Sequence, residues 1–521
     1  MRQAFIIGLD FGTASARGVL MDAESGHQRA VAVHAYRHGV ISGSLPNGRK
    51  IPRDYVLQDP QDYVEALEVI LRKLASGLEV VAIGIGCTAC SPLLAYGDGV
   101  ALLNDFHDEP HAYVKLWKHS AAQRYADAIS AQGGEFLDDF GGRVSGEWML
   151  PKALEIKNEA PVLWNKAERF IEAGDWIVWQ LTAREARSQD FACFKAQFRP
   201  EVGYPSHIVP GLAARLSDPL PVGSPAGTMT EAWCSRTGVI GRPVVAVASI
   251  DSHVVLPAVG AIRGGAFVGA LGTSAGFLAL SDDYRRLPCG LEGAGFGAAL
   301  PNVWCCEAGQ AAFGDMLTWF VEAFPLAPDL AANFSKYNAA AAEMRPQQSG
   351  MLALDWFGGN RIPSADTTLS GLLVGLRIGS TGVGIYRSLV ESLCFGTRLI
   401  LELTEDGGVS IDDVILTSGL AHSNTFLVSV MADVLGRKVF VPRIENPTAV
   451  GAAIHGAVAG GVAANFFDGN QRFGAKSRNS FEPDLGRHAQ YEVLYSQYKN
   501  LVANRELVGV MHRLYSASLN V

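Results

Sequence analysis

Short apolar runs alternate with helical patterns along this chain. Residues 4–10, 80–85 and 243–250 are mostly consecutive apolar residues, which is typical of buried strands. Residues 60–76 and 315–323 instead repeat apolar positions at helical spacing. The alternation predicts an α/β protein.

The same alternation continues toward the C-terminus. We expect helices at 385–403, 425–435 and 449–454, strands at 414–417 and 438–442, and a helical tail from 488 to 514. In the tail, Tyr491, Tyr495 and Tyr498 fall on one side of the helix. That spacing favours packing residues over a binding stripe.

Two hairpin patterns lie about half a chain apart. Residues 4–21 form strand, Gly-containing turn and strand, and residues 265–280 repeat this order around Gly272-Thr273-Ser274. The repeat suggests a duplicated architecture with a boundary near 257–265. The alternative, two unrelated turns in two sheets, stays open on these residues alone.

Composition narrows the class of protein. The chain has 521 residues, 57 glycines, 48% hydrophobic and 18% charged residues, which excludes disordered and collagen-like chains. Its net charge of −9 argues against a general nucleic-acid or anionic-membrane surface. The apolar run at the start is too short for an export signal, and residues 266–280 are too short and glycine-rich for a membrane span. We therefore expect a soluble, cytoplasmic protein.

The cysteines predict no metal centre. Cys87 and Cys90 have the spacing of a metal or redox motif, but zinc would require a second pair or nearby histidines. Reduced, buried structural thiols are the favoured interpretation.

Two glycine-bearing turns have the chemistry of a phosphate site. Asp10 ends a predicted strand beside Gly12 and Thr13, and Gly272, Thr273 and Ser274 form the second such turn. Backbone amides and hydroxyls can bind phosphate, and a carboxylate can hold magnesium. An ordinary Asp-containing hairpin is the alternative for the first turn. Surplus glycines such as Gly8, Gly12 and Gly272 would let the backbone approach phosphate, and Gly451 would let helices pack closely.

Two further acidic residues lie in suggestive places. Asp251 directly follows a predicted buried strand, where a carboxylate can take the proton of a hydroxyl that attacks phosphorus. We expect His253 to be a packed or hydrogen-bonded neighbour rather than a second base. Glu307 precedes a predicted helix, so its alternative role is to favour the helix dipole from the first turn.

Four motifs in order resemble the FGGY carbohydrate kinases of the actin/hexokinase/Hsp70 superfamily. The motifs are Gly8-Leu-Asp-Phe-Gly-Thr13, Ile250-Asp-Ser-His253, Leu271-Gly-Thr-Ser274 and Ala449-Val-Gly-Ala-Ala453. Within that family the segments 110–119, 170–182, 306–310 and 352–361 are most similar to the L-ribulokinases. The similarity runs from about residue 4 to about residue 505.

The resemblance implies two ribonuclease-H-like domains around a central cleft. It places a sugar-binding domain at 1–260, an ATP-binding domain at 261–485 and a helical tail at 486–521. By similarity, Asp251 is the catalytic base and Asp10 lies near Mg²⁺ and the γ-phosphate. The remaining implied contacts are Trp117, Lys195, Glu307 and Asp251 for the sugar, Gly12, Thr13, Gly272, Thr273 and Ser274 for phosphate, and Gly419, Ala421 and Asn424 for adenosine.

The implied activity is transfer of a phosphoryl group from ATP to the terminal hydroxyl of a ketopentose, with L-ribulose as the first candidate. Two departures bear on this expectation: the loop from Gly86 to Cys90 is shorter than in ribulokinases and lacks their acid, and Ser418 replaces a common glycine. D-ribulose, xylulose or a pentitol are therefore alternative substrates.

A regulator without catalysis is a second alternative, which the retained Asp10 and Asp251 disfavour. A chaperone would need a peptide-binding domain, for which too little chain follows Gly461. The expected partners are a sugar and ATP, with no nucleic acid and no membrane, and a homodimer is suggested by the family.

Overall fold

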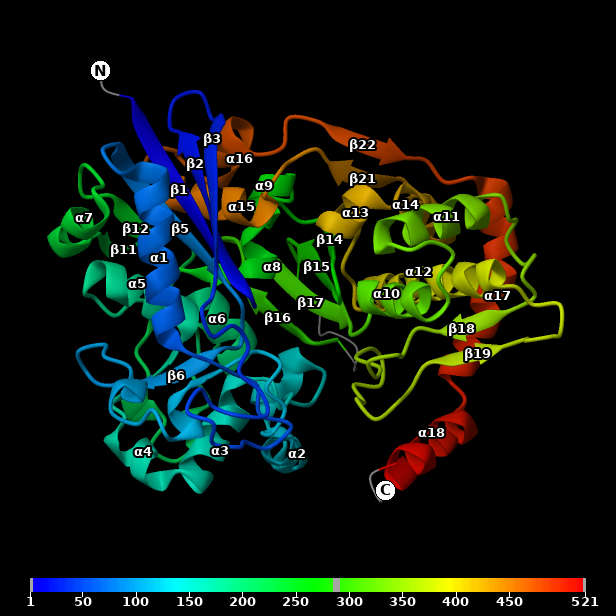
Figure 1. The fold of residues 1–521 in the computed structure, drawn as a ribbon, viewed down its shortest axis with the longest axis horizontal. Helices are drawn as coiled ribbons and strands as arrows, with labels where there is room; N and C mark the ends of the chain where they lie inside the picture. Colours follow the sequence, from blue (N-terminus) through cyan, green and yellow to red (C-terminus); the bar gives the residue numbers. More distant parts are fainter. Residues whose placement is uncertain (1–2, 284–290, 519–521) are drawn as a thin grey trace. The chain divides into compact units, whose positions relative to one another are not determined.

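The computed structural model describes residues 3–283 and 291–518, which form alternating strands and helices (Figure 1). They group into two compact units. The first comprises Met1–Ile262, Ala294–Cys305 and Ile444–Lys476, and the second comprises Arg263–Gly293, Cys306–Arg443 and Ser477–Val521.

The first unit contains a mixed sheet in the order β11-β12-β5-β1-β2-β3, with β13 also paired to β5. Its strands are β1 (Ala4–Phe11), β2 (Ser15–Asp22), β3 (Gln28–Ala35), β5 (Glu79–Cys87), β11 (Pro225–Thr228), β12 (Val244–Ala246) and β13 (Ser249–Ile250). β1 is antiparallel to β2 and parallel to β5, so the predicted N-terminal hairpin and buried strand are confirmed. The strand expected at 243–250 is divided into β12 and β13.

The second sheet has the order β16-β17-β15-β14-β20-β21-β22. Its strands are β14 (Ala266–Leu271), β15 (Ala275–Ser281), β16 (Gly293–Phe296), β17 (Trp304–Gln310), β20 (Asp413–Thr417), β21 (Val439–Pro442) and β22 (Arg478–Phe481). β14 is antiparallel to β15 and parallel to β20, and β20 is parallel to β21. In both sheets the first strand therefore lies between its hairpin partner and a parallel strand, which confirms the duplicated architecture.

Helices cover both faces of the first sheet. Consecutive strand residues point to opposite faces, so Gly8 and Leu9 contact different layers. A Cβ on Gly8 would lie 1.8 Å from the Ala449 carbonyl oxygen of α15 (Pro447–Ala459). Gly18, which pairs with Leu9, instead faces α1 (Pro60–Ala75). The sheet thus lies between α15 and α1.

Close packing, rather than access for a ligand, explains Gly8. Gly84 of β5 has the same role, because its Cβ would lie 1.8 Å from the Ala452 carbonyl oxygen. Gly451 also allows close packing, since its Cβ would lie 1.9 Å from the Val254 carbonyl oxygen. The expectation for Gly451 is confirmed, whereas the expectation that Gly8 approaches phosphate is wrong.

The remaining elements complete each unit. The first unit adds α2 (Gln123–Gln132), α3 (Met149–Glu159), α4 (Pro161–Lys166), α5 (Ala173–Thr182), α6 (Gln189–Ala196), α7 (Glu231–Thr237), α8 (Asp251–Val254), α9 (Leu256–Val259), α16 (Phe466–Phe473) and the short strands β4 (Leu57–Gln58), β6 (Pro92–Ala95), β7 (Val114–Lys115), β8 (Arg169–Glu172), β9 (Arg187–Ser188) and β10 (Pro219–Leu220). The second unit adds α10 (Gly314–Ala323), α11 (Leu330–Ala342), α12 (Gly382–Asp406), α13 (Gly419–Ser423), α14 (Thr425–Leu435), α17 (Leu485–Val502), α18 (Arg505–Ser518), β18 (Leu352–Leu354) and β19 (Leu372–Val374).

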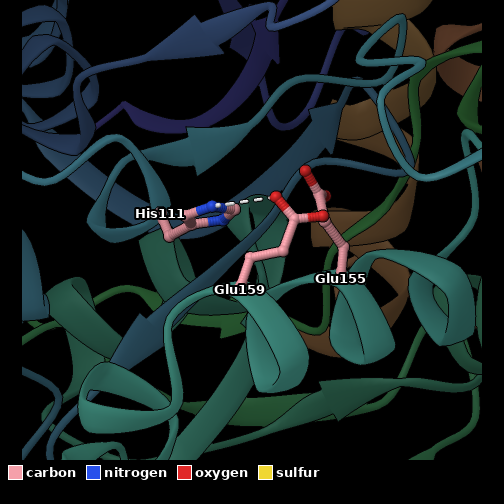
Figure 2. Close-up of side chains that lie close together, drawn as sticks. All are labelled: His111, Glu155 and Glu159. Atoms are coloured by element: carbon pink, nitrogen blue, oxygen red, sulfur yellow. Dashed lines mark ion pairs between the residues drawn. The ribbon is translucent and has the colours of Figure 1, made fainter.

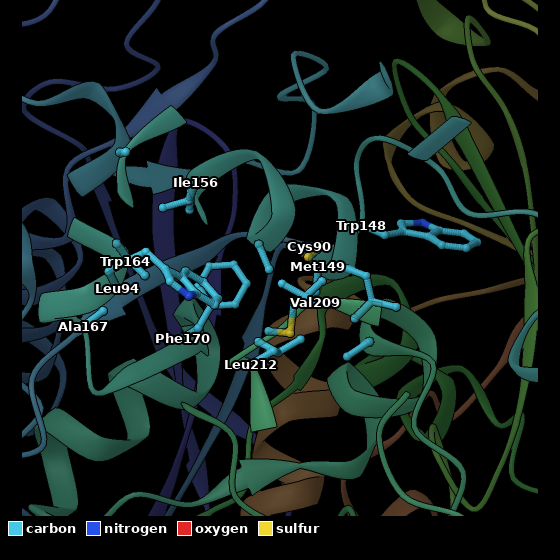
Figure 3. Close-up of a cluster of buried hydrophobic side chains, with 14 of the residues drawn as sticks. Cys90, Leu94, Trp148, Met149, Ile156, Trp164, Ala167, Phe170, Val209 and Leu212 are labelled. Carbon is cyan, nitrogen blue, oxygen red and sulfur yellow. The ribbon is translucent and has the colours of Figure 1, made fainter. Parts of the chain in front are cut away.

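The first unit contains a further hydrophobic cluster away from its sheet. It is built by residues between 41 and 212, and Figure 3 shows Cys90, Met149 and Phe170 among its members. The cluster anchors β6, β8, α3 and α4, which hold the loops around the candidate site.

The predicted packing role of the C-terminal tail is confirmed, but the tail forms two helices rather than one. Tyr491, Tyr495 and Tyr498 of α17 are all buried. The helix ends at Val502, and the Asn504 side chain accepts a hydrogen bond from the Leu507 amide at 3.0 Å. This cap starts α18 as a separate helix. In the described parts of the chain, no helix has both the length and the apolar character that crossing a membrane requires.

The division into units differs from the expected boundaries in one respect. The first boundary, after Ile262, lies close to the expected residue 260. Residues Ile444–Lys476 were expected in the second domain but belong to the first unit. The reason is the glycine-mediated contact of α15 with β1 and β5.

Candidate active site

Asp10 is the penultimate residue of β1, directly before the Gly12-Thr13 loop. It pairs with Arg17 of β2 on one side and with Gly86 of β5 on the other. Burial and then the negative charge of Asp251 raise the pKa of Asp10 to about 7, although the positive charge of Arg17 opposes the shift. The carboxylate therefore lies where a proton or a cation stabilises it.

Asp251 reaches the same edge of the sheet from the other side of β5. Ser249 and Ile250 of β13 pair in parallel with Gly86 and Cys87, and Asp251 follows as the first residue of α8. Its Oδ1 accepts a hydrogen bond from the Ser252 amide at 2.8 Å. Because β1 and β13 are both parallel to β5 at Gly86 and Cys87, the two predicted acids meet at the carboxyl end of the sheet.

The turn after β1 contacts the predicted sugar-binding tryptophan. The indole Nε1 of Trp117 donates a hydrogen bond to Oγ1 of Thr13 at 3.0 Å. Gln58 donates to the Thr13 carbonyl oxygen at 2.6 Å, and the Gly12 amide donates to the Ser15 carbonyl oxygen at 3.0 Å. The structure thus brings Trp117, Gly12 and Thr13 together beside Asp10.

The short loop after β5 forms the next part of this region. The Thr88 amide donates to the Phe11 carbonyl oxygen at 3.0 Å, which joins the loop to the end of β1. Glu172 accepts hydrogen bonds from the Cys90 thiol at 2.8 Å and from the Ser91 amide at 2.7 Å. Burial raises the pKa of the Cys90 thiol, so both observations agree with a structural thiol.

Lys152 joins this loop to the segment that contains Trp117. Its ammonium group is fully buried and donates to the carbonyl oxygens of Cys90 at 2.7 Å, Leu116 at 3.0 Å and Lys115 at 3.3 Å. Sequence reasoning missed Lys152 and Glu172. A charged residue within an otherwise apolar run, such as Lys152 in Met149-Leu-Pro-Lys-Ala153, could have indicated a buried charge.

Lys195 lies on α6 and is 6% exposed. Burial raises the pKa of the Glu172 carboxyl. The hydrogen bonds from Cys90 and Ser91, and then the positive charges of Lys152 and Lys195, oppose that shift. The predicted sugar-binding lysine is therefore close to the Cys90 loop. His253 is fully buried, and its Nδ1 lies 2.7 Å from Oδ1 of Asp190, which confirms the expected hydrogen-bonded neighbour.

The second unit contains the other predicted phosphate turn. The Thr273 carbonyl oxygen accepts hydrogen bonds from the amides of Phe313 at 2.8 Å and Asp315 at 3.1 Å. The Gly314 amide donates to the Gly272 carbonyl oxygen at 3.0 Å, so the start of α10 holds the turn that ends at Ser274. Glu307 lies within β17, which rules out its alternative placement in the first turn of a helix.

The predicted adenosine segment follows β20. Ala270 of β14 pairs with Thr417, so Ser418 and the Gly272 turn lie at the same end of the second sheet. Gly419 and Ala421 belong to α13, and the Asn424 side chain caps α14 by accepting from the Leu427 amide at 3.0 Å. A Cβ on Gly419 would meet nothing within 4 Å. Gly419 is exposed, so no neighbouring atom contacts this side of its backbone.

A second buried charge cluster surrounds Glu155, on α3. Figure 2 shows His111 and Glu159 beside it, a set of residue types that can hold a metal ion. Lys115 already lies 3.6 Å from the Glu155 carboxylate, and His119 lies 3.0 Å from it. Although burial opposes ionisation, these partners lower the pKa of Glu155 to about 2. The cluster is therefore a network in which Lys115 supplies the positive charge.

Comparisons with known proteins find relatives that match nearly the whole chain. The model for the C-terminal domain of the FGGY family of carbohydrate kinases matches residues 268–460. A ribulokinase of Bacillus licheniformis is 36% identical over 522 residues, covering 94% of each chain. A ribulokinase of Mycolicibacterium smegmatis is 35% identical and covers 95% of this chain and 93% of its own.

A solved structure supports the fold independently of sequence. The xylulose kinase from Rhodospirillum rubrum superposes with a TM-score of 0.82 at 20% identity, covering 98% of this chain and 100% of that one. At this identity the match establishes the fold alone, which this chain shares with that kinase. Since two full-length relatives exceed a third in identity and the family model matches the second half, the chain belongs to the FGGY family of carbohydrate kinases.

Proposed function

We propose that this chain is an ATP-dependent kinase that phosphorylates the terminal hydroxyl of a ketopentose. The first candidate reaction converts L-ribulose to L-ribulose 5-phosphate. The observation that supports it most is the pair Asp10 and Asp251 at the carboxyl end of the first sheet, in a chain whose relatives include ribulokinases. An enzyme that uses ATP in this way would act in the cytoplasm, and a homodimer is the oligomer we expect.

Asp251 is the proposed general base. It would accept the proton of the sugar's terminal hydroxyl as that oxygen attacks the γ-phosphorus and ADP leaves. Its position at the start of α8, fixed through β13 to β5, supports this role because a base needs a defined orientation.

Asp10 is the proposed ligand of the magnesium ion that accompanies ATP. When bound, the ion supplies positive charge opposite the phosphoryl oxygens. The residues fit such an ion because burial and the charge of Asp251 raise the pKa of Asp10, and a cation would relieve both effects.

The sugar would be held by Trp117, Lys195 and Glu307. The hydrogen bond from Trp117 to Thr13 holds the indole ring beside the proposed phosphate turn, where the ring would pack against an apolar face of the sugar. The ammonium group of Lys195 can donate hydrogen bonds to sugar oxygens, and the carboxylate of Glu307 can accept hydrogen bonds from sugar hydroxyls. Phosphate would be held by Gly12, Thr13, Gly272, Thr273 and Ser274, and adenosine by Gly419, Ala421 and Asn424.

The proposal is tested by measuring ADP release with a panel of sugars. L-ribulose, D-ribulose, D- and L-xylulose, ribitol and arabinitol are compared at equal ATP and Mg²⁺, with sugar-free ATP hydrolysis as the control. We expect kcat/KM for L-ribulose to exceed that of every other compound by at least about tenfold, since one misplaced hydroxyl leaves buried polar groups unpaired. Absence of sugar-dependent ADP release with all of them would contradict the proposal and favour a non-catalytic binding protein.

A second candidate keeps the chemistry and changes the acceptor. It is favoured by the short loop after β5, which Glu172 and Lys152 hold beside the end of β1 without the acid expected in ribulokinases. D-ribulose, xylulose or a pentitol would then be preferred in the same assay.

A further inference from the structure

Asp190 on α6 binds the segment that leads to the proposed base. Its carboxylate is fully buried and accepts three hydrogen bonds. Oδ2 accepts from Ser249 Oγ at 2.6 Å and from the Ile250 amide at 2.9 Å, and Oδ1 lies 2.7 Å from Nδ1 of His253. These partners flank Asp251 on both sides in the chain.

The three contacts constrain two different elements. Ser249 and Ile250 form β13, and His253 belongs to α8, so Asp190 joins the strand before Asp251 to the helix that Asp251 begins. The Asp190 carboxylate, as one acceptor for all three groups, thereby fixes the backbone turn around Asp251. A buried carboxylate with three polar partners is well satisfied, whereas its loss would leave three buried polar groups without an acceptor.

The same residue links the base to the proposed sugar site. Asp190 and Lys195 lie on α6, whose start is fixed by a hydrogen bond from the Asp190 amide to Ser188 Oγ at 3.2 Å. The His253 ring also packs against Phe194, with ring centroids 4.6 Å apart. The hydrogen bonds of Asp190 therefore hold the helix that carries Lys195 in a fixed position relative to the strand that leads to Asp251.

We propose that Asp190 is a positioning residue for Asp251, holding the turn from Ser249 to His253 so that the carboxylate of the base points at the acceptor hydroxyl. This inference rests on the proposed function of Asp251. Catalytic groups need their orientation fixed by neighbouring hydrogen bonds, and a displacement of about 1 Å can cost about a hundredfold in rate.

The most informative variant is Asp190→Asn, because it keeps the shape of the side chain. The amide oxygen can still accept from Ser249 and Ile250, but the amide nitrogen would be placed opposite His253 Nδ1. A carboxylate oxygen accepts hydrogen bonds, so Nδ1 of His253 is the donor in this contact. The variant therefore sets two donors against each other unless the ring or the turn changes.

We expect Asp190→Asn to lower kcat by at least about tenfold while the KM for the sugar changes less than about threefold. Amides 250–254 should also exchange hydrogen faster by mass spectrometry. Ser249→Ala removes one of the three contacts and should lower kcat by a smaller factor, which keeps the test informative if the first variant folds poorly.

Asp175→Asn is the matched control. Asp175 is also buried, and its Oδ1 accepts from the Ser188 amide at 2.9 Å, at the start of the same helix. It should affect thermal stability without altering kcat or exchange at 250–254. A normal kcat in folded Asp190→Asn and Ser249→Ala would overturn the positioning role. If the unmodified chain showed no sugar-dependent turnover, the proposed function would fail instead, and unchanged exchange at 250–254 in Asp190→Asn would separately overturn the inference.

Discussion

Ser418 has a backbone conformation that ordinarily requires glycine. Its φ is 77° and its ψ is 175°, in a region where a Cβ is unfavourable. The sequence shows only that a serine replaces a common glycine, and the structure supplies the reason why glycine is common there. The position directly precedes Gly419, so the strained backbone lies at the proposed adenosine segment.

Replacing Ser418 with glycine should therefore stabilise the protein. Relief of the unfavourable conformation should raise the free energy of unfolding by about 1 kcal/mol, measured by denaturant titration. Ser423→Gly is the control, because Ser423 is an exposed residue of α13 and its replacement should lower stability by roughly 0.5–1 kcal/mol. Equal losses in both variants would contradict the strain at Ser418.

Asp10 should make stability depend on pH. Its pKa rises from 3.8 to about 7 on folding, so the folded state retains a proton that the unfolded state has lost between these values. The resulting stabilisation is complete below pH 3.8 and disappears as the pH rises through about 7.

Asp10→Asn, which stays neutral, should gain stability relative to the unmodified protein as the pH rises from 4 to 8. The gain has an upper limit of about 4 kcal/mol, because each unit of pKa shift corresponds to about 1.4 kcal/mol. Unfolding curves at both pH values, without Mg²⁺ or ATP, measure it. Asp127→Asn, at an exposed position of α2, is the control and should show no such trend.

At the scale of elements, α15 is held against the first sheet by residues that lack side chains. Gly8 and Gly84 let the strands approach α15, and Gly451 lets α15 approach Val254 of α8, at positions where a Cβ would lie less than 2 Å from a carbonyl oxygen. The motif Ala449-Val-Gly-Ala-Ala453 is thus explained by packing. Its small residues were evident from the sequence, but the strands that they contact were not, because those strands lie more than 360 residues earlier.

Gly8→Ala should test this packing. The added methyl group has no room beside Ala449, so we expect a loss of about 3 kcal/mol or more, seen as a large drop in melting temperature or in folded yield. Gly276→Ala on β15, where a Cβ would meet nothing within 4 Å, should be close to neutral. Similar stability for both variants would argue against the contact.

Element positions were more predictable than their partners. The hairpins at β1–β2 and β14–β15 and helix α14 follow from local apolar patterns and glycine turns. Glu307 lies in a strand because β17 pairs within the second sheet, a contact that local pattern does not encode. The roles of Glu172, Lys152 and Asp190 also depend on hydrogen bonds between residues far apart in the chain.

In the whole molecule, the two sheets share a strand order in which the first strand lies between its hairpin partner and a parallel strand. The segment Ile444–Lys476, although late in the chain, belongs to the first unit. The repeat of hairpins correctly indicated the duplication, and composition correctly indicated a folded protein. The return of Ile444–Lys476 was not predictable, because the chain order suggested that the second domain continued through this segment. The candidate acids could be found from the sequence, since strand ends followed by Asp are local signals.

As the proposed base of a sugar kinase, Asp251 should be required for turnover but not for folding. The most direct test compares sugar-dependent ADP release by the unmodified protein and Asp251→Asn, with L-ribulose, ATP and Mg²⁺ at saturation. Loss of the base should lower kcat by about 10² to 10⁴, while the melting temperature stays within a few degrees. A kcat within threefold of the unmodified protein, in a correctly folded variant, would contradict the account.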